Sequence, residues 1–205
     1  MSQEVLEAGP EPKRRAVRPW AVWTAGIAAL VVLTVANALA VAELASRTAE
    51  ADALVTAVEA SESAMKSTQD EFAAVVEEYD TESLTDAERE ELRGRLSDVA
   101  ERGGAAIASA GEGVAEVQVL PWHGSVAAAQ EAYLAHNRAW VAYMAAAAED
   151  PAEWFRPQPD VNDTFAQAKE PLVAAVPLFD LLGTLPRIEL IYVTGSGDSG
   201  DAQSA

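Results

Sequence analysis

The chain has 205 residues, which is enough for one domain and a membrane anchor. It contains no cysteine, so disulfides, thiolate nucleophiles and cysteine metal sites are excluded. Its formal net charge of −19 would repel phosphate backbones, and we therefore expect no binding to nucleic acid. Alanine and valine dominate the hydrophobic residues and only 6% of residues are aromatic, which favours closely packed helices over a β-sandwich. The composition is typical of a protein from a GC-rich bacterium.

Residues 1–19 are polar and rich in proline, which is typical of a disordered segment. Three arginines, Arg14, Arg15 and Arg18, lie just before a long apolar run and are expected at the membrane interface. By the positive-inside rule, this basic cluster predicts that the N-terminus is cytoplasmic and that the C-terminal part of the chain is extracytoplasmic.

An uncharged run of 24 residues follows the arginines. Because about 20 apolar residues cross the hydrocarbon core of a bilayer as a helix, we predict a single-pass transmembrane signal anchor over residues 20–42. Trp20 and Trp23 lie at its cytoplasmic edge, where aromatic side chains commonly meet lipid headgroups. The alternative is a signal peptide cleaved after Ala40, although the run is longer than the apolar stretch of about 7–15 residues in such peptides.

Residues 43–193 are predicted to form an extracytoplasmic helical domain. Apolar residues at alternating spacings of three and four continue the anchor helix to about Tyr79, and neither proline nor glycine interrupts this segment. A second helix over 85–119 begins at a capping box formed by Thr85 and Glu88. Glycines in its second half either permit close contact between helices or mark a bend.

A third helix is predicted from a Ser125 cap to Glu149, because Asp150 and Pro151 stop it there. The segment that follows contains three prolines, and we expect a loop over residues 151–161. This loop separates the third helix from a fourth.

The fourth helix is predicted to begin at a second capping box, Thr164 with Gln167, and to end at Gly183 and Pro186. A short apolar piece then either extends this helix or lies against the domain, and residues 194–205 are expected to be disordered. Four helical segments joined by short turns predict an all-α fold, in which a single transmembrane helix continues into an extracytoplasmic antiparallel four-helix bundle.

The sequence contains no motif for catalysis or for a cofactor, and we expect neither an enzyme nor a bound metal. His123 and His136 are the only histidines, and no carboxylate lies at helical spacing to complete a site of three ligands. The acidic residues at 77–91 have the spacing of a solvated helix end, where acids stabilise the helix dipole.

One face of the third helix combines aromatic and polar side chains. These candidate site residues are Tyr133, His136, Asn137 and Trp140. If they are buried, their polar groups must be hydrogen-bonded and would fix the register of the helix. The alternative is a small-ligand pocket, since pockets between the helices of a bundle combine aromatic side chains with a few polar groups.

Trp154 and Phe155 stand among the prolines of the predicted loop. An aromatic pair in such a loop either covers the helical core or contacts a partner. We single it out as the candidate partner contact.

These features predict a membrane-anchored helical protein that acts as an interaction or assembly module in the bacterial cell envelope. Its expected partners are the lipid bilayer and another envelope protein or a second copy of the chain. The alternative is a small-ligand-sensing module that signals through a separate membrane partner.

Overall fold

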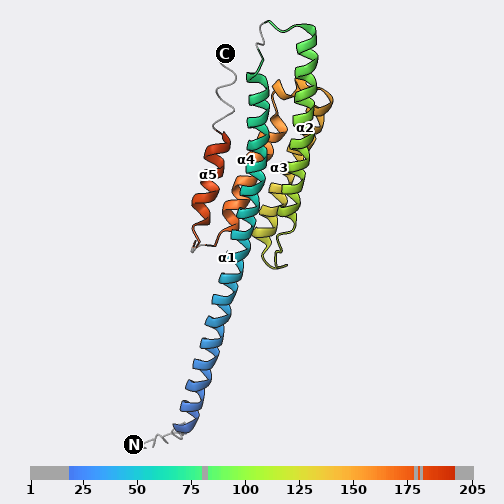
Figure 1. The fold of residues 1–205 in the computed structure, drawn as a ribbon. Helices are drawn as coiled ribbons and strands as arrows, with labels where there is room; N and C mark the ends of the chain where they lie inside the picture. The colour runs from blue at the N-terminus through green and yellow to red at the C-terminus, as the bar shows by residue number, and fades with distance from the viewer. Residues whose placement is uncertain (1–18, 80–82, 178–179, 181, 197–205) are drawn as a thin grey trace, which may run out of the picture. The chain divides into compact units, whose positions relative to one another are not determined.

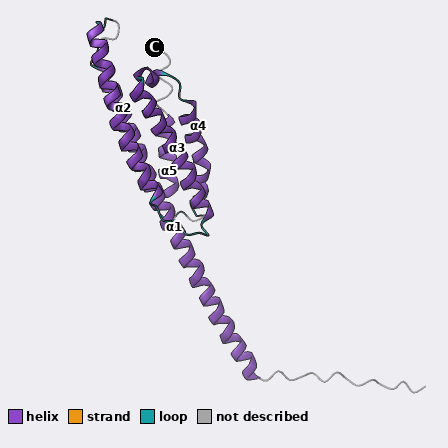
Figure 2. Ribbon diagram, turned by 90° about the vertical axis from the view of Figure 1, so that its right-hand side faces the viewer, coloured by secondary structure: helices purple, strands orange, loops and turns teal. Residues whose placement is uncertain are grey.

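The computed structural model describes residues 19–79, 83–177, 180 and 182–196. Over these ranges the chain is all-α and contains no strand, as the sequence predicts (Figure 1). It has five α-helices, one more than the four predicted, and one short 3-10 helix. Figure 2 shows the same elements coloured by secondary structure. The elements are α1 (Pro19–Glu77), α2 (Asp86–Ala115), α3 (Gly124–Glu149), the 3-10 helix η1 (Pro151–Phe155), α4 (Pro159–Ala175) and α5 (Thr184–Ser196).

The chain divides into two compact units, Met1–Glu43 and Leu44–Ala205. In the first unit, the N-terminal part of α1 is long and apolar enough to cross a membrane. Its large apolar side chains between Trp23 and Val41 are 52–75% exposed, so the described part of the protein does not cover them. This helix is therefore a candidate membrane span.

In the second unit, α1 buries one face against the other helices. Its buried apolar residues are Ala51, Leu54, Val55, Val58, Met65, Phe72 and Val75. The polar residues that accompany them are small: Thr48, Ser61 and Thr68 are all buried. Small side chains at these positions let neighbouring helices approach α1 closely, because helix–helix distance depends on the side chains at the contact.

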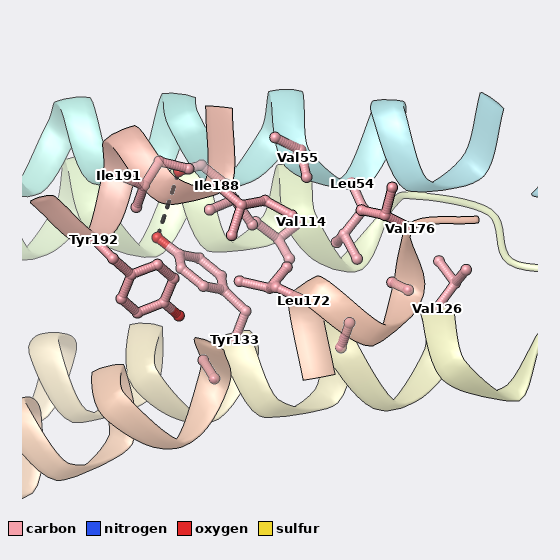
Figure 3. Packing of buried hydrophobic residues seen from close by; sticks show 14 residues of the cluster. Leu54, Val55, Val114, Val126, Tyr133, Leu172, Val176, Ile188, Ile191 and Tyr192 are labelled. Atoms are coloured by element: carbon pink, nitrogen blue, oxygen red, sulfur yellow. Dashed lines mark hydrogen bonds between the residues drawn. The ribbon is translucent and has the colours of Figure 1, made fainter. Parts of the chain in front are cut away.

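The interior of the second unit contains two apolar clusters. The first, part of which Figure 3 shows, includes Leu54, Val58, Val114, Val126, Tyr133, Leu172, Ile188, Ile191 and Tyr192. The second includes Met65, Phe72, Leu96, Val99, Ile107, Trp140, Met144 and Val161. Helices α1, α2, α3 and α4 each contribute to both clusters, whereas the buried apolar residues of α5 belong to the first.

Helix α2 begins as predicted, because Thr85 and Glu88 form both hydrogen bonds of a capping box. It ends at Ala115, four residues earlier than expected. The helix is unbroken through its glycines, and a Cβ on Gly103 would lie 2.2 Å from a side-chain atom of Thr68. Close contact between helices therefore explains this glycine.

Two predicted helix starts are wrong. Helix α3 begins at Gly124 without a side-chain cap, and the Ser125 hydroxyl instead accepts a hydrogen bond from Arg47. Helix α4 begins at Pro159, so the predicted loop is shorter than 151–161 and also contains η1. Proline at a first helical position needs no hydrogen-bond partner for its nitrogen, and this start leaves Thr164 inside the helix, where its hydroxyl donates to the Asp160 carbonyl.

The predicted end of the fourth helix is also wrong. Helix α4 ends at Ala175, and a separate helix, α5, begins after Gly183, whose φ is +67°. The Asp180 carboxylate accepts the backbone N–H groups of Thr184 and Leu185 at 2.8 Å, which satisfies the start of α5. Pro186 therefore lies in the first turn of a helix and does not terminate one.

Two predicted disordered segments lie mostly outside the described residues. Of the expected tail over 194–205, residues 194–196 belong to α5, and the rest is not described. The expected N-terminal segment over 1–19 lies outside the described residues, except that Pro19 begins α1.

Candidate functional site

Helix α3 carries the four candidate site residues on the face that it turns toward the interior. Tyr133, His136, Asn137 and Trp140 are all buried. They face different neighbours: Tyr133 belongs to the first apolar cluster, whereas Trp140 belongs to the second and packs beside Tyr143. The structure therefore places Trp140 among apolar side chains. It is separate from the hydrogen-bonded groups of the other three residues.

A carboxyl group from α1 reaches Tyr133 and His136. The Tyr133 hydroxyl donates to Oε1 of Glu62 at 2.8 Å, and Nε2 of His136 lies 3.6 Å from the same oxygen. On the other side of the ring, Nδ1 of His136 lies 3.3 Å from the hydroxyl of Thr164 in α4. One carboxyl oxygen thus joins α1 to α3, and the imidazole joins α3 to α4.

Helix α5 adds a fourth member to this group. Figure 3 shows Tyr192 of α5 beside Tyr133, and the Tyr192 ring stacks on Phe165 with 4.4 Å between the ring centroids. Glu62 is close enough that its charge helps to raise the pKa of Tyr192, although burial is the larger cause. We call Glu62, Tyr133, His136 and Tyr192 the Glu62 cluster.

Burial changes the protonation of both central groups. It raises the pKa of Glu62 to about 7, and the hydrogen bond from Tyr133 opposes this change only in part. It lowers the pKa of His136 to about 4. Between these values both groups are mainly neutral, because the interior disfavours the charged form of an acid and of a base alike.

Asn137 makes a separate polar contact in the interior. Its amide nitrogen donates to the Ser61 hydroxyl and to the Ile107 carbonyl, each at 3.0 Å. A Cβ on Gly111 would lie 2.2 Å from its amide oxygen. The amide therefore ties α3 to α1 and α2, and the absence of a side chain at Gly111 provides the space that it occupies.

The interior around these residues is filled by side chains. Tyr133 and His136 are almost completely covered by neighbouring side chains. Across the described ranges, no three His, Cys, Asp or Glu side chains are grouped so that they could hold a metal ion. The arrangement suits proton binding and helix register better than the binding of a small molecule.

The aromatic pair of the predicted loop is divided between interior and surface. Trp154 of η1 stacks on Phe72 of α1, with 3.8 Å between ring centroids, and on Tyr143 of α3. Phe155 is 63% exposed. Beside it lies a shallow groove, lined by Arg89, Leu92, Arg93, Leu96, Asp150, Pro151, Ala152 and Phe155.

The predicted membrane-interface residues lie near the start of the described chain or before it. Trp23 is in α1 and 75% exposed, and Trp20 lies in the first turn of α1. Arg14, Arg15 and Arg18 lie outside the described residues. In the candidate span, the Asn37 amide donates to the Leu33 carbonyl at 2.8 Å, so its polar group is satisfied within its own helix.

Three polar residues that anchor helices were not singled out from the sequence as sites. In the sequence, Glu62 is marked only as a charged residue that interrupts the apolar residues spaced three and four apart before Tyr79. Arg187 of α5 pairs with Glu59 and Asp52 of α1, and Glu50 of α1 pairs with His123. A charged residue at an apolar position is the one signal that marks Glu62 in advance, because buried charges need partners.

Comparison with known proteins gives no match: no family model, curated protein or solved structure is significantly similar to the chain.

Proposed function

We propose that this protein is a single-pass, membrane-anchored helical protein that acts as an interaction or assembly module in the bacterial cell envelope. The observation that carries the proposal is the continuity of α1, one uninterrupted helix from Pro19 to Glu77. Its first part is apolar and exposed, and its last part is buried among other helices. A helix of this kind supports a domain tethered directly to a bilayer.

We further propose that α1, α2, α3 and α4 form an antiparallel four-helix bundle outside the cell membrane. The membership of the two apolar clusters supports this arrangement. In the second unit, Leu54 and Val126 lie toward the start of their parts of α1 and α3. They share a cluster with Val114 and Leu172, which lie toward the ends of α2 and α4. The opposite combination occurs in the second cluster, which is the pattern expected when successive helices reverse direction.

Two features favour an interaction role over the alternative of small-ligand sensing. The interior at Tyr133, His136 and Trp140 is filled, which gives a ligand no space there. At the surface, Phe155 is exposed beside the groove that α2 and η1 line. An exposed aromatic side chain next to a groove supports a contact with another protein, either an envelope protein or a second copy of the chain.

The absence of cysteine allows the membrane topology to be tested directly. A single cysteine is introduced at exposed Asp98 in α2 or at Ser2 near the N-terminus, and intact cells are treated with a membrane-impermeant maleimide. We expect Asp98→Cys to react in intact cells and Ser2→Cys to react only after lysis. The reverse pattern, or cleavage of the chain after Ala40 seen by mass spectrometry, would refute an anchor with a cytoplasmic N-terminus.

The interaction role is tested by photo-cross-linking in native membranes. A benzophenone amino acid replaces Phe155, and the matched control places it at Glu131, an exposed position of α3. We expect one discrete adduct from position 155 and none from position 131, and the adduct mass distinguishes a second copy from another protein. Equal, diffuse labelling at both positions would contradict a specific contact at Phe155.

A further inference from the structure

Helix α5 is attached to the rest of the second unit by two different kinds of contact. Near its start, Arg187 donates to both carboxylate oxygens of Glu59, at 2.8 and 2.6 Å, and it also pairs with Asp52. Further along, the buried side chains of Ile191 and Tyr192 lie in the first apolar cluster. The first contact is ionic and the second is apolar, so a new negative charge beside the second would weaken it without breaking the first.

The apolar contact lies next to the Glu62 carboxyl group. Tyr192 stacks on Phe165 of α4, and Lys169 of the same helix places its Nζ 5.3 Å from the centre of the Tyr192 ring. Glu62 itself is 21% exposed, and within the described part of the chain no lysine or arginine pairs with it. An ionised Glu62 would thus be a poorly compensated negative charge beside the site that holds α5.

The titratable groups around Glu62 lie on α3, α4, α5 and its own helix α1. Helix α3 presents Tyr133 and His136, and α5 presents Tyr192. On α4, Lys169 faces the Tyr192 ring, and on α1 the neighbouring Glu59 is already paired with Arg187. No titratable side chain of α2 contacts Glu62 in the described ranges. Of these groups, Glu62 is the one that changes charge near neutral pH, because burial keeps His136 neutral down to a pKa of about 4.

We propose that Glu62 is a proton-operated latch for α5. The neutral carboxyl group lets Ile191 and Tyr192 seat on the first apolar cluster, and the ionised carboxylate favours their release. Arg187 continues to hold the start of the helix, so release exposes the cluster residues that the later turns of α5 cover. The raised pKa of Glu62, about 7, supports this direction, because the carboxyl group then ionises near neutral pH.

Proton linkage fixes the sign of the effect. Since burial raises the pKa of Glu62, the closed form binds the proton more tightly than an open form in which the carboxyl group is solvated. The closed form is therefore fully favoured at low pH, and the advantage is lost as pH rises through about 7. Opening of α5 should accordingly become easier between pH 5.5 and pH 8.

Hydrogen exchange of the full chain in detergent micelles tests the latch. Exchange rates of α5 amides in the wild type are divided by those in Glu62→Gln at the same pH, so that the intrinsic pH dependence of exchange cancels. We expect this ratio to increase about tenfold between pH 5.5 and pH 8, because Gln cannot ionise. A ratio that stays constant within about twofold, or one that increases equally for α3 amides, would overturn the latch.

Two further variants separate the latch from general loosening of α5. Glu59→Gln weakens the pairing with Arg187, and we expect it to make α5 exchange faster by the same factor at both pH values. In the wild type, the pairing lowers the pKa of Glu59, so Glu59 is ionised at both. Ile191→Cys provides the single thiol of the chain and a second readout. At each pH, the labelling rate of this cysteine is divided by its rate in the variant that also carries Glu62→Gln. We expect this ratio to increase between pH 5.5 and pH 8, and a constant ratio would refute release of Ile191.

Discussion

Nδ1 of His123 lies 2.7 Å from Oε2 of Glu50, and this pair fastens the turn before α3 to α1. Both side chains are almost fully buried, and the same carboxylate oxygen accepts the backbone N–H of Leu120 at 3.3 Å. One acidic side chain thus holds both ends of a four-residue turn. The turn has no side-chain cap of its own at the start of α3, which explains why it depends on α1.

We expect His123→Ala to lower the free energy of unfolding by about 2 kcal/mol, because it leaves the buried Glu50 carboxylate without the imidazole that pairs with it. Glu131→Gln, an exposed change in α3, should alter it by less than about 0.5 kcal/mol. Urea unfolding followed by tryptophan fluorescence gives both values. A double-mutant cycle with Glu50→Ala should show a coupling energy above about 1 kcal/mol, and strict additivity would contradict the pairing.

Two glycines of α2 offer a matched comparison. We expect Gly111→Ala to destabilise the protein by about 1–3 kcal/mol, because its Cβ would lie 2.2 Å from the Asn137 amide oxygen. Gly113→Ala meets nothing within 4 Å and should stabilise the helix by up to about 1 kcal/mol, since alanine has the better helix propensity. Thermal unfolding measured by circular dichroism distinguishes the two. The same sign for both variants would contradict the close approach of α2 and α3 at Gly111.

Opposite pH effects are expected for the two central groups of the Glu62 cluster. The raised pKa of Glu62 contributes stability that is present below about pH 4.5 and is lost as pH rises through about 7. Relative to the wild type, Glu62→Gln should therefore gain stability as pH rises. The lowered pKa of His136 contributes stability that is present above about pH 6.5 and is lost as pH falls toward about 4. Relative to the wild type, His136→Gln should therefore gain stability as pH falls.

Each of these differences should span about 1–3 kcal/mol, since one pKa unit corresponds to about 1.4 kcal/mol. Urea unfolding of the wild type and the two variants at pH 4.5, 5.5, 6.5 and 8 measures them. Slopes of the same sign in both variants would show that the two groups do not have the environments described above.

Neighbouring aromatic residues of η1 should behave differently when truncated. Trp154→Ala removes a ring that stacks on Phe72 and Tyr143, and we expect a loss of about 3 kcal/mol in the free energy of unfolding. Phe155→Ala should change it by less than about 0.5 kcal/mol, because most of the ring is exposed. Chemical denaturation checks both values. A large loss in Phe155→Ala would indicate a structural role and weaken the case for a partner contact.

Local signals in the sequence were sufficient for the start of α2 and insufficient for the start of α4. The capping box of Thr85 and Glu88 involves only residues three apart, so the sequence contains all of it. Thr164 and Gln167 have the same spacing, but Pro159 starts the helix earlier and the Thr164 hydroxyl bonds within it. Both proline and the capping box are start signals, and their spacing alone does not say which one acts.

The candidate site was only partly accessible to sequence reasoning for a different reason. Helical spacing groups Tyr133, His136 and Asn137 on one face, and the structure buries that face. Their partners, however, come from other helices: Glu62 lies 71 residues from Tyr133, and Ser61 lies 76 residues from Asn137. Periodicity within one helix contains no information on which side chains of another helix it meets. The close approach at Gly111 is likewise a property of two packed helices.

The shared membership of the two apolar clusters has a consequence for how the second unit unfolds. Helix α1 places Leu54 in one cluster and Phe72 in the other, and α4 does the same with Leu172 and Val161. Neither cluster can come apart while these helices stay straight, so their melting is coupled, and the second unit should lose both in one cooperative step. In a fragment that contains one cluster without the other, the shared helices would expose about half of their apolar face to water.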